Sequence, residues 1–242
     1  MNDWQLVLLA GLLTAFATGL GAIPFAFIRT VSPRMVATAN AIASGLMLGA
    51  SFGLMIEGAG YGTLETVAGG AVGVIFILLG ERYLEGHDFS IGDLQAADAK
   101  KVLLILAVMT LHSFSEGVAV GVAFGGGDKL ATLITIAIAV HNIPEGLAIS
   151  AVMRPRGASI LACVGWSIFS SLPQPLMAVP AFLFVDAFRP FLPYGLGFAA
   201  GAMVLMVFLE LLPESYEHLP AQRVALWVGL TLGGMVLFQQ FL

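Results

Sequence analysis

The pattern His-x-x-x-Glu-Gly occurs twice in the sequence, each time within an apolar stretch. The first copy covers residues 112–117 and the second covers residues 141–146. In a helix, residues four apart lie on the same face, so each copy places an imidazole beside a carboxylate. Two imidazoles and two carboxylates suit a divalent transition-metal ion in donor type, number and charge. The four residues that we expect to bind such an ion are His112, Glu116, His141 and Glu145.

Both motifs are predicted to lie near the middle of a membrane. His112 comes about ten residues after Val102, where a stretch without charges begins, and His141 comes about eleven residues after Leu130. At 1.5 Å per residue these separations are about 15 and 16 Å, which is half of a hydrocarbon core about 30 Å thick. We also expect Pro144 to kink the second helix beside His141, because proline removes a backbone hydrogen bond.

The composition requires most of the surface to face lipid. The chain has 242 residues, of which 59% are hydrophobic and 10% are charged, whereas an ordinary soluble domain is about 45–50% apolar and about 25% charged. Its mean hydropathy is +0.96. These values exclude a soluble enzyme. They indicate a membrane protein whose surface contacts the lipid bilayer. The net charge of −5 excludes the basic surface that nucleic-acid binding needs.

The positions of the charges predict an all-α, polytopic membrane protein with eight transmembrane helices. The third is the weakest, because Glu65 shortens its uninterrupted stretch. The connections between them are short, so we expect one transmembrane domain over residues 1–242. The predicted spans cover residues 4–28, 35–56, 62–80, 102–124, 130–153, 157–185, 190–209 and 224–242.

The basic residues predict how the chain is oriented. Lys and Arg concentrate on the cytoplasmic side of membrane proteins. The chain has ten Lys and Arg residues. Eight of them lie in or beside the loops that join spans 1 and 2, 3 and 4, 5 and 6, and 7 and 8. The other two lie in loops on the opposite side of the membrane. This division places both termini outside the cytoplasm. The eight are Arg29, Arg34, Arg82, Lys100, Lys101, Arg154, Arg156 and Arg223, and the two are Lys129 and Arg189.

The two motifs resemble the ZIP (Zrt/Irt-like) family of divalent-metal transporters, and in particular its prokaryotic members of the GufA or zinc-uptake type. The resemblance rests on residues 112–117 and on His-Asn-Ile-Pro-Glu-Gly at residues 141–146. It implies a ZIP-like bundle whose fourth and fifth helices supply a metal site near the membrane midplane. It also implies alternating access in the plasma (inner) membrane, with cations carried toward the cytoplasm. Zinc is then the substrate, with iron, manganese or cadmium as alternatives, and no cofactor is expected.

Three positions depart from the pattern of many family members, which build a second metal site beside the first. Ser113, Asn142 and Gln174 stand at what look like those places. None of them is a carboxylate, so a tightly held second metal ion is not expected. The carbonyl oxygen of Asn142 or Gln174 can still contact a passing ion.

Three further acids are candidates for the transport pathway. Glu210 and Glu214 share a face near the cytoplasmic end of the seventh helix and are candidates for passing the ion out. Glu57 lies near the external end of the second helix and is a candidate for the entrance. The alternative for such residues is an ordinary solvated helix end.

Other functions remain open at this stage. Each His–Glu pair can instead be a neutral, hydrogen-bonded clasp between helices. The strongest functional rival is a membrane-embedded zinc hydrolase, which would use the same ligands to activate water, although the sequence contains no His-Glu-x-x-His motif. A proton-coupled carrier of a non-metal solute is a second rival. The sequence leaves the preferred metal, the coupling to protons or potential, and a homodimeric state undecided.

Overall fold

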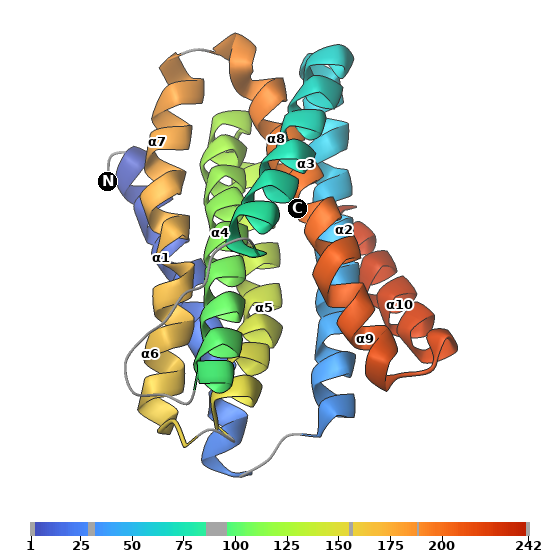
Figure 1. Cartoon of the computed structure of the whole chain (residues 1–242). Coiled ribbons are helices and arrows are strands. Elements are labelled where there is room, and N and C mark those ends of the chain that lie inside the picture. Colours follow the sequence, from blue (N-terminus) through green and yellow to red (C-terminus); the bar gives the residue numbers. More distant parts are fainter. Residues whose placement is uncertain (1–2, 29–31, 86–95, 155–156, 188, 241–242) are drawn as a thin grey trace.

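The computed structural model describes residues 3–28, 32–85, 96–154, 157–187 and 189–240, and all secondary structure in these ranges is helical (Figure 1). The elements are α1 (Asp3–Leu20), the 3-10 helix η1 (Ile23–Ala26), α2 (Pro33–Tyr61), α3 (Thr63–Glu85), α4 (Ala96–Gly126), α5 (Asp128–Met153), α6 (Ile160–Ser171), α7 (Pro173–Ala187), the 3-10 helix η3 (Arg189–Phe191), α8 (Leu192–Met206), the π-helix η4 (Val207–Leu211), α9 (Leu212–His218) and α10 (Ala221–Gln240).

The predicted class, an all-α polytopic membrane protein, is confirmed. Seven helical segments of the described chain are long and apolar enough to cross a membrane, and the weakest predicted span, residues 62–80, is represented among them by Thr63–Gly80. Helix α4 is 31 residues long, but several side chains in its first half lie outside the described part of the chain. The eighth span therefore stays a prediction.

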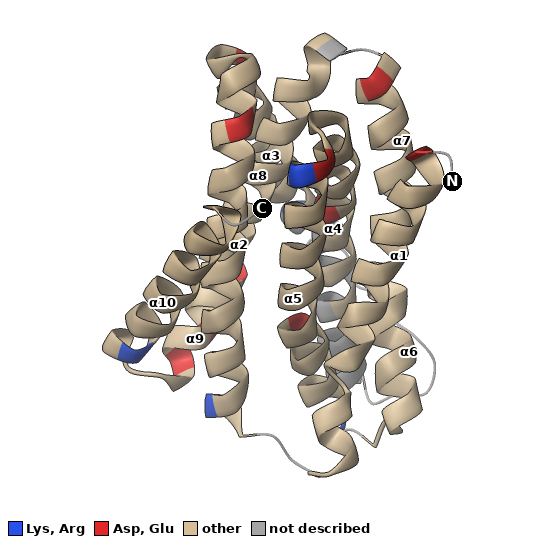
Figure 2. Cartoon of the chain, turned by 180° about the vertical axis from the view of Figure 1, so that it is seen from behind, with Lys and Arg blue, Asp and Glu red and all other residues tan. Residues whose placement is uncertain are grey.

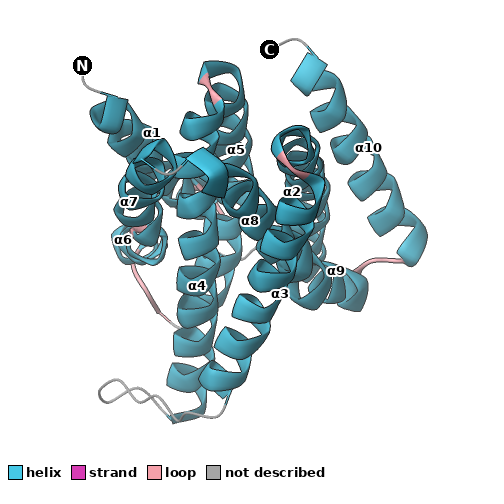
Figure 3. Cartoon of the chain, turned by 90° about the horizontal axis from the view of Figure 1, so that it is seen from above, coloured by secondary structure: helices cyan, strands magenta, loops and turns pink. Residues whose placement is uncertain are grey.

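The helices form two groups that share an interface. Helices α1, α4 and α5 pack with α6 and α7, while α2, α3, α8 and α9 pack together and α10 lies against α2 (Figure 3). Contacts of α2 with α5 and of α4 with α8 join the groups. Acidic and basic residues lie mainly near the ends of the helices (Figure 2). Glu116 and Glu145 are exceptions, since they are buried within α4 and α5.

Prolines follow irregular turns in the helical segments of the sixth and seventh predicted spans. The sixth is divided into α6 and α7 at Leu172, whose N–H bonds the carbonyl of Phe169 three residues back, and Pro173 follows with no N–H to continue an α-helix. The seventh continues beyond its predicted end at residue 209, through η4 and α9 to His218. In a regular α-helix the ring of Pro213 would clash with the carbonyl of Leu209, four residues earlier. The wider π turn at Val207–Leu211 includes that carbonyl.

Pro144 does not divide its helix. Helix α5 runs without interruption from Asp128 to Met153 with Pro144 inside it, as lipid-embedded helices can when neighbouring groups satisfy the freed carbonyl. The second motif therefore lies on a continuous helix, and all of its polar members keep their helical register.

Candidate metal centre

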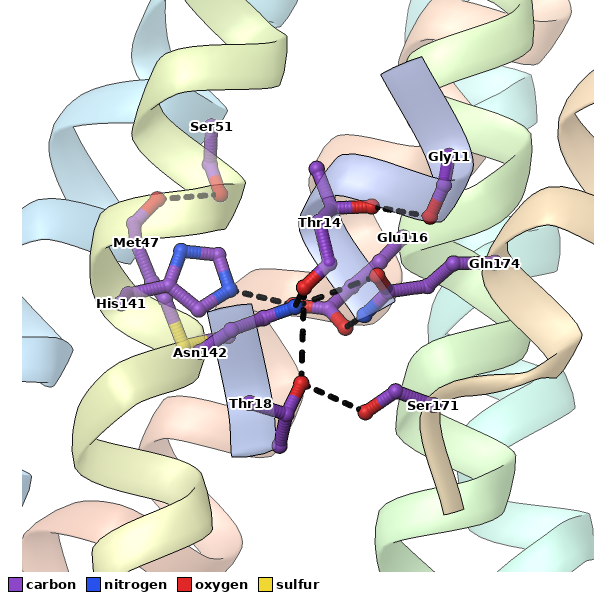
Figure 4. A network of polar contacts seen from close by, with 10 residues as sticks. All are labelled: Gly11, Thr14, Thr18, Met47, Ser51, Glu116, His141, Asn142, Ser171 and Gln174. Carbon is purple, nitrogen blue, oxygen red and sulfur yellow. Dashed lines mark hydrogen bonds and ion pairs between the residues drawn. The ribbon is translucent and has the colours of Figure 1, made fainter. Parts of the chain in front are cut away.

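Three of the four predicted ligands lie together in the interior of the bundle. Glu116 comes from α4, and His141 and Glu145 come from α5; one ligand atom from each lies within 4.8 Å of the others. Their exposed fractions are 0%, 0% and 3%. His141 Nε2 contacts Glu116 Oε1 directly (Figure 4). His112 lies in α4 four residues before Glu116, but its side chain is outside the described part of the chain.

The spacing of these atoms is close to what a zinc ion requires. Ligand nitrogen and oxygen atoms lie about 2.0–2.2 Å from zinc, so two of them on one ion can be at most about 4.4 Å apart. The three atoms already lie within 4.8 Å of one another. The three atoms are therefore close enough together to be candidate ligands of one ion.

The glycine that closes each motif has a packing role that the spacing of His and Glu does not reveal. A Cβ atom on Gly117 would lie 2.6 Å from the carbonyl oxygen of Gln174, and one on Gly146 would overlap the carbonyl oxygen of Thr18. The absence of a side chain at both positions allows α7 to approach α4, and α1 to approach α5. The two glycines thus bring further polar groups next to the ligands.

Two of these groups are amides at positions that the sequence singled out. Gln174 Nε2 in α7 donates to Glu116 Oε2 over 2.6 Å. Asn142 Nδ2 in α5 donates to Gln174 Oε1 over 3.1 Å and to the carbonyl oxygen of Thr14 over 2.8 Å. Ser113, the third of these positions, is fully buried, and its hydroxyl makes no hydrogen bond to the described residues.

Helix α1 also contributes to the site, which the sequence analysis missed. The carbonyl of Thr14 accepts from Asn142, and the hydroxyl of Thr18 lies 2.7 Å from that of Ser171 at the end of α6. A backbone acceptor has no signature in the sequence. The available signal was the pair of buried threonines, four residues apart, in a helix that is apolar after Gln5.

The other three candidate acids lie outside the buried cluster. Glu214 in α9 accepts a 2.8 Å hydrogen bond from Asn40 in α2, and Glu210 lies half-buried in η4. Glu57 is half-buried in α2 and lines a pocket of about 380 Å³ with Lys129 and other residues. These positions are compatible with a pathway, but they do not form part of the buried cluster.

The chain matches the family model described as ZIP zinc transporter over residues 80–239. It belongs to the ZIP family. The resemblance inferred from the motifs is thereby confirmed, as is the prediction of a transporter rather than an enzyme. The matched region of this ZIP protein contains α4 to α10, whereas α1 and α2 precede it.

Relatives of this ZIP protein cover the first helices as well. It is 32% identical to zinc transporter GufA of Myxococcus xanthus, over 87% of this chain and 88% of that protein. It is also 32% identical to zinc transporter ZIPB of Bordetella bronchiseptica, over 89% of this chain and 75% of that protein. A protein of Arabidopsis thaliana is 46% identical over 97% of this chain, which spans only 39% of the plant protein.

Proposed function

We propose that this protein transports divalent transition-metal cations, above all zinc, across a membrane toward the cytoplasm. The observation that carries the proposal is the buried cluster of Glu116, His141 and Glu145. Ionisable side chains at membrane depth are costly and are retained where they serve a function. The names of the bacterial relatives, both zinc transporters, support the choice of metal. Iron, manganese and cadmium remain the alternatives.

The cluster favours a dication on grounds of charge and donor type. Two carboxylates and an imidazole supply hard and borderline donors with a charge of about −2, which a divalent transition metal neutralises. His112 completes the proposed set of four ligands. A cation bound there takes the place of the proton between His141 Nε2 and Glu116 Oε1, because metal ligands must be deprotonated. In this proposal zinc or another divalent cation is the substrate, and we expect no cofactor.

The pathway in this proposal runs from Glu57 to the end of α9. Glu57 and its pocket beside Lys129 form the entrance, and Glu210 and Glu214 receive the ion on the cytoplasmic side. The direction of transport follows the family resemblance. The distribution of Lys and Arg supports an orientation with both termini outside the cytoplasm. We propose one transmembrane domain in the plasma (inner) membrane for the whole chain.

Zinc uptake into proteoliposomes that contain a zinc-sensitive dye tests the proposal. We expect Glu145→Gln to lower the rate at least about tenfold, the loss seen when even an outer partner of a metal ligand is removed. Glu65→Gln is the matched control, because Glu65 lies in the first turn of α3 and not in the cluster. Equal rates in both variants would refute the site. Bound zinc without flux, together with hydrolysis of a lipid or peptide, would favour the hydrolase.

A further inference from the structure

A directional chain of hydrogen bonds connects the backbone of α1 to one oxygen of Glu116 (Figure 4). It begins at the Thr14 carbonyl, which accepts from Asn142 Nδ2 over 2.8 Å. Asn142 Nδ2 also donates to Gln174 Oε1 over 3.1 Å, and Gln174 Nε2 donates to Glu116 Oε2 over 2.6 Å. All four residues are at most 1% exposed, so the chain lies away from bulk solvent.

The direction of this chain is fixed at its first atom. A backbone carbonyl can only accept, so the nitrogen of the Asn142 side chain must face Thr14. The second N–H of the Asn142 amide then points to Gln174, which accepts this hydrogen bond through Oε1. Gln174 therefore turns its own nitrogen toward Glu116. The orientation of both amides follows from the peptide group of α1.

This arrangement gives the two oxygens of Glu116 different surroundings. Oε1 faces His141 Nε2, which belongs to the cluster. Oε2 faces the N–H group of Gln174, whose positive end is directed at the place where a cation bound to Oε2 would lie. A hydrogen bond to a charged acceptor is among the stronger kinds in proteins, so it restricts rotation of the carboxylate.

We propose that Asn142 and Gln174 are positioning residues that make this site take a single cation. They hold Glu116 with Oε1 toward His141, and they close its Oε2 side to a second ion. The proposal rests on the proposed function, because it concerns the same metal ion. The residue types alone already favour one tightly held ion. The proposal adds the cause: a neutral chain of amides, anchored on α1, prevents a second ion from binding.

Two substitutions at one position test the proposal. Gln174→Leu replaces the amide with an apolar side chain and so removes the donor to Glu116. We expect zinc to bind about 10- to 100-fold more weakly, still one ion per chain. Gln174→Glu places a second carboxylate opposite Glu116 Oε2, and we expect two ions per chain. The measurement is equilibrium dialysis of purified protein in detergent against zinc, followed by elemental analysis.

Ser170→Ala is the matched control. Ser170 is 1% exposed, lies four residues before Gln174, and bonds the carbonyl of Ser167 rather than a member of the amide chain. We expect this variant to bind one ion with the affinity of the unmodified protein. A general disturbance of packing would affect Ser170→Ala and Gln174→Leu alike.

The outcomes separate this proposal from the proposed function. If the unmodified protein binds one ion and the three variants behave as expected, both are supported. If it binds two ions, or if Gln174→Leu retains full affinity, the positioning role is refuted while metal binding stands. If Gln174→Glu fails to fold, the affinity of Gln174→Leu decides the matter. If the unmodified protein binds no zinc, both proposals are refuted.

Discussion

Asn40 in α2 donates a 2.8 Å hydrogen bond from Nδ2 to Oε2 of Glu214 in α9. Asn40 is 1% exposed, so this contact connects two helices inside the protein. The donor is neutral, so this contact brings no positive charge next to Glu214. Neither α2 nor α9 carries a member of the buried cluster, so the pair is a separate target for mutation.

Loss of this contact is expected to destabilise the protein. Asn40→Ala removes the donor and leaves a half-buried carboxylate oxygen without it, which should lower the free energy of unfolding by about 1–3 kcal/mol. Denaturation of the purified protein in detergent measures the change. Thr38→Ala is the control, because the exposed Thr38 hydroxyl bonds a carbonyl of its own helix. Similar values for both variants would show that the Asn40 contact contributes no stability.

Neutralising Glu214 should slow transport without weakening zinc binding at the central site. Glu214 is not a member of the buried cluster, so Glu214→Gln is expected to reduce the uptake rate several-fold while zinc affinity at equilibrium stays the same. The exposed Glu217, also in α9, supplies the control Glu217→Gln. If both variants transport zinc at the normal rate, Glu214 is an ordinary solvated acid and has no place in the pathway.

Zinc affinity should fall as the pH is lowered. Imidazole and carboxylate ligands must lose their protons to bind a metal, so binding releases protons and acid opposes it. Titration of purified protein with zinc between about pH 8 and about pH 5 measures the dependence. Glu145→Gln removes one ligand that competes for protons and should give a shallower dependence. A zinc affinity that does not vary with pH would contradict metal binding by the His–Glu pairs and would favour a structural role for them.

The glycine at the end of the second motif should not tolerate a methyl group. Gly146→Ala places a Cβ atom against the carbonyl oxygen of Thr18, and overpacking of this kind costs about 1–3 kcal/mol or more. Thermal unfolding in detergent measures the loss. Gly165→Ala is the control, since a Cβ atom at Gly165 meets no other atom within 4 Å. An equal melting temperature in the two variants would contradict the close approach of α1 and α5.

The four candidate ligands can be picked out from the sequence because their chemistry conflicts with their surroundings. A His and a Glu four residues apart are conspicuous in an apolar stretch, and three of the four predicted ligands do lie together. The contribution of α1 escapes prediction because it is made by the carbonyl of Thr14, a group that every residue carries. The hydrogen bond from Gln174 to Glu116 likewise depends on how closely α7 approaches α4, which Gly117 permits but does not specify.

The ends of the helices are predicted less well than the spans. Charges mark where the chain leaves lipid, whereas a helix ends where its backbone hydrogen bonds end. Helix α2 therefore continues beyond residue 56 to Tyr61, which places Glu57 within the helix. The segment after α8 continues to His218 because a π turn precedes Pro213. A π turn depends on local geometry and leaves no periodic pattern in the sequence.

The π turn at Val207–Leu211 sets the rotational phase between α8 and α9. A π turn is equivalent to one extra residue in an α-helix, and one residue corresponds to a rotation of about 100°. Everything after it, including Glu214, is turned by that amount relative to a regular continuation of α8. The contact of Glu214 with Asn40 therefore depends on a turn whose own residues do not take part in it. Deleting the exposed Phe208 together with Pro213→Ala would reset the phase and separate the two side chains without altering either of them.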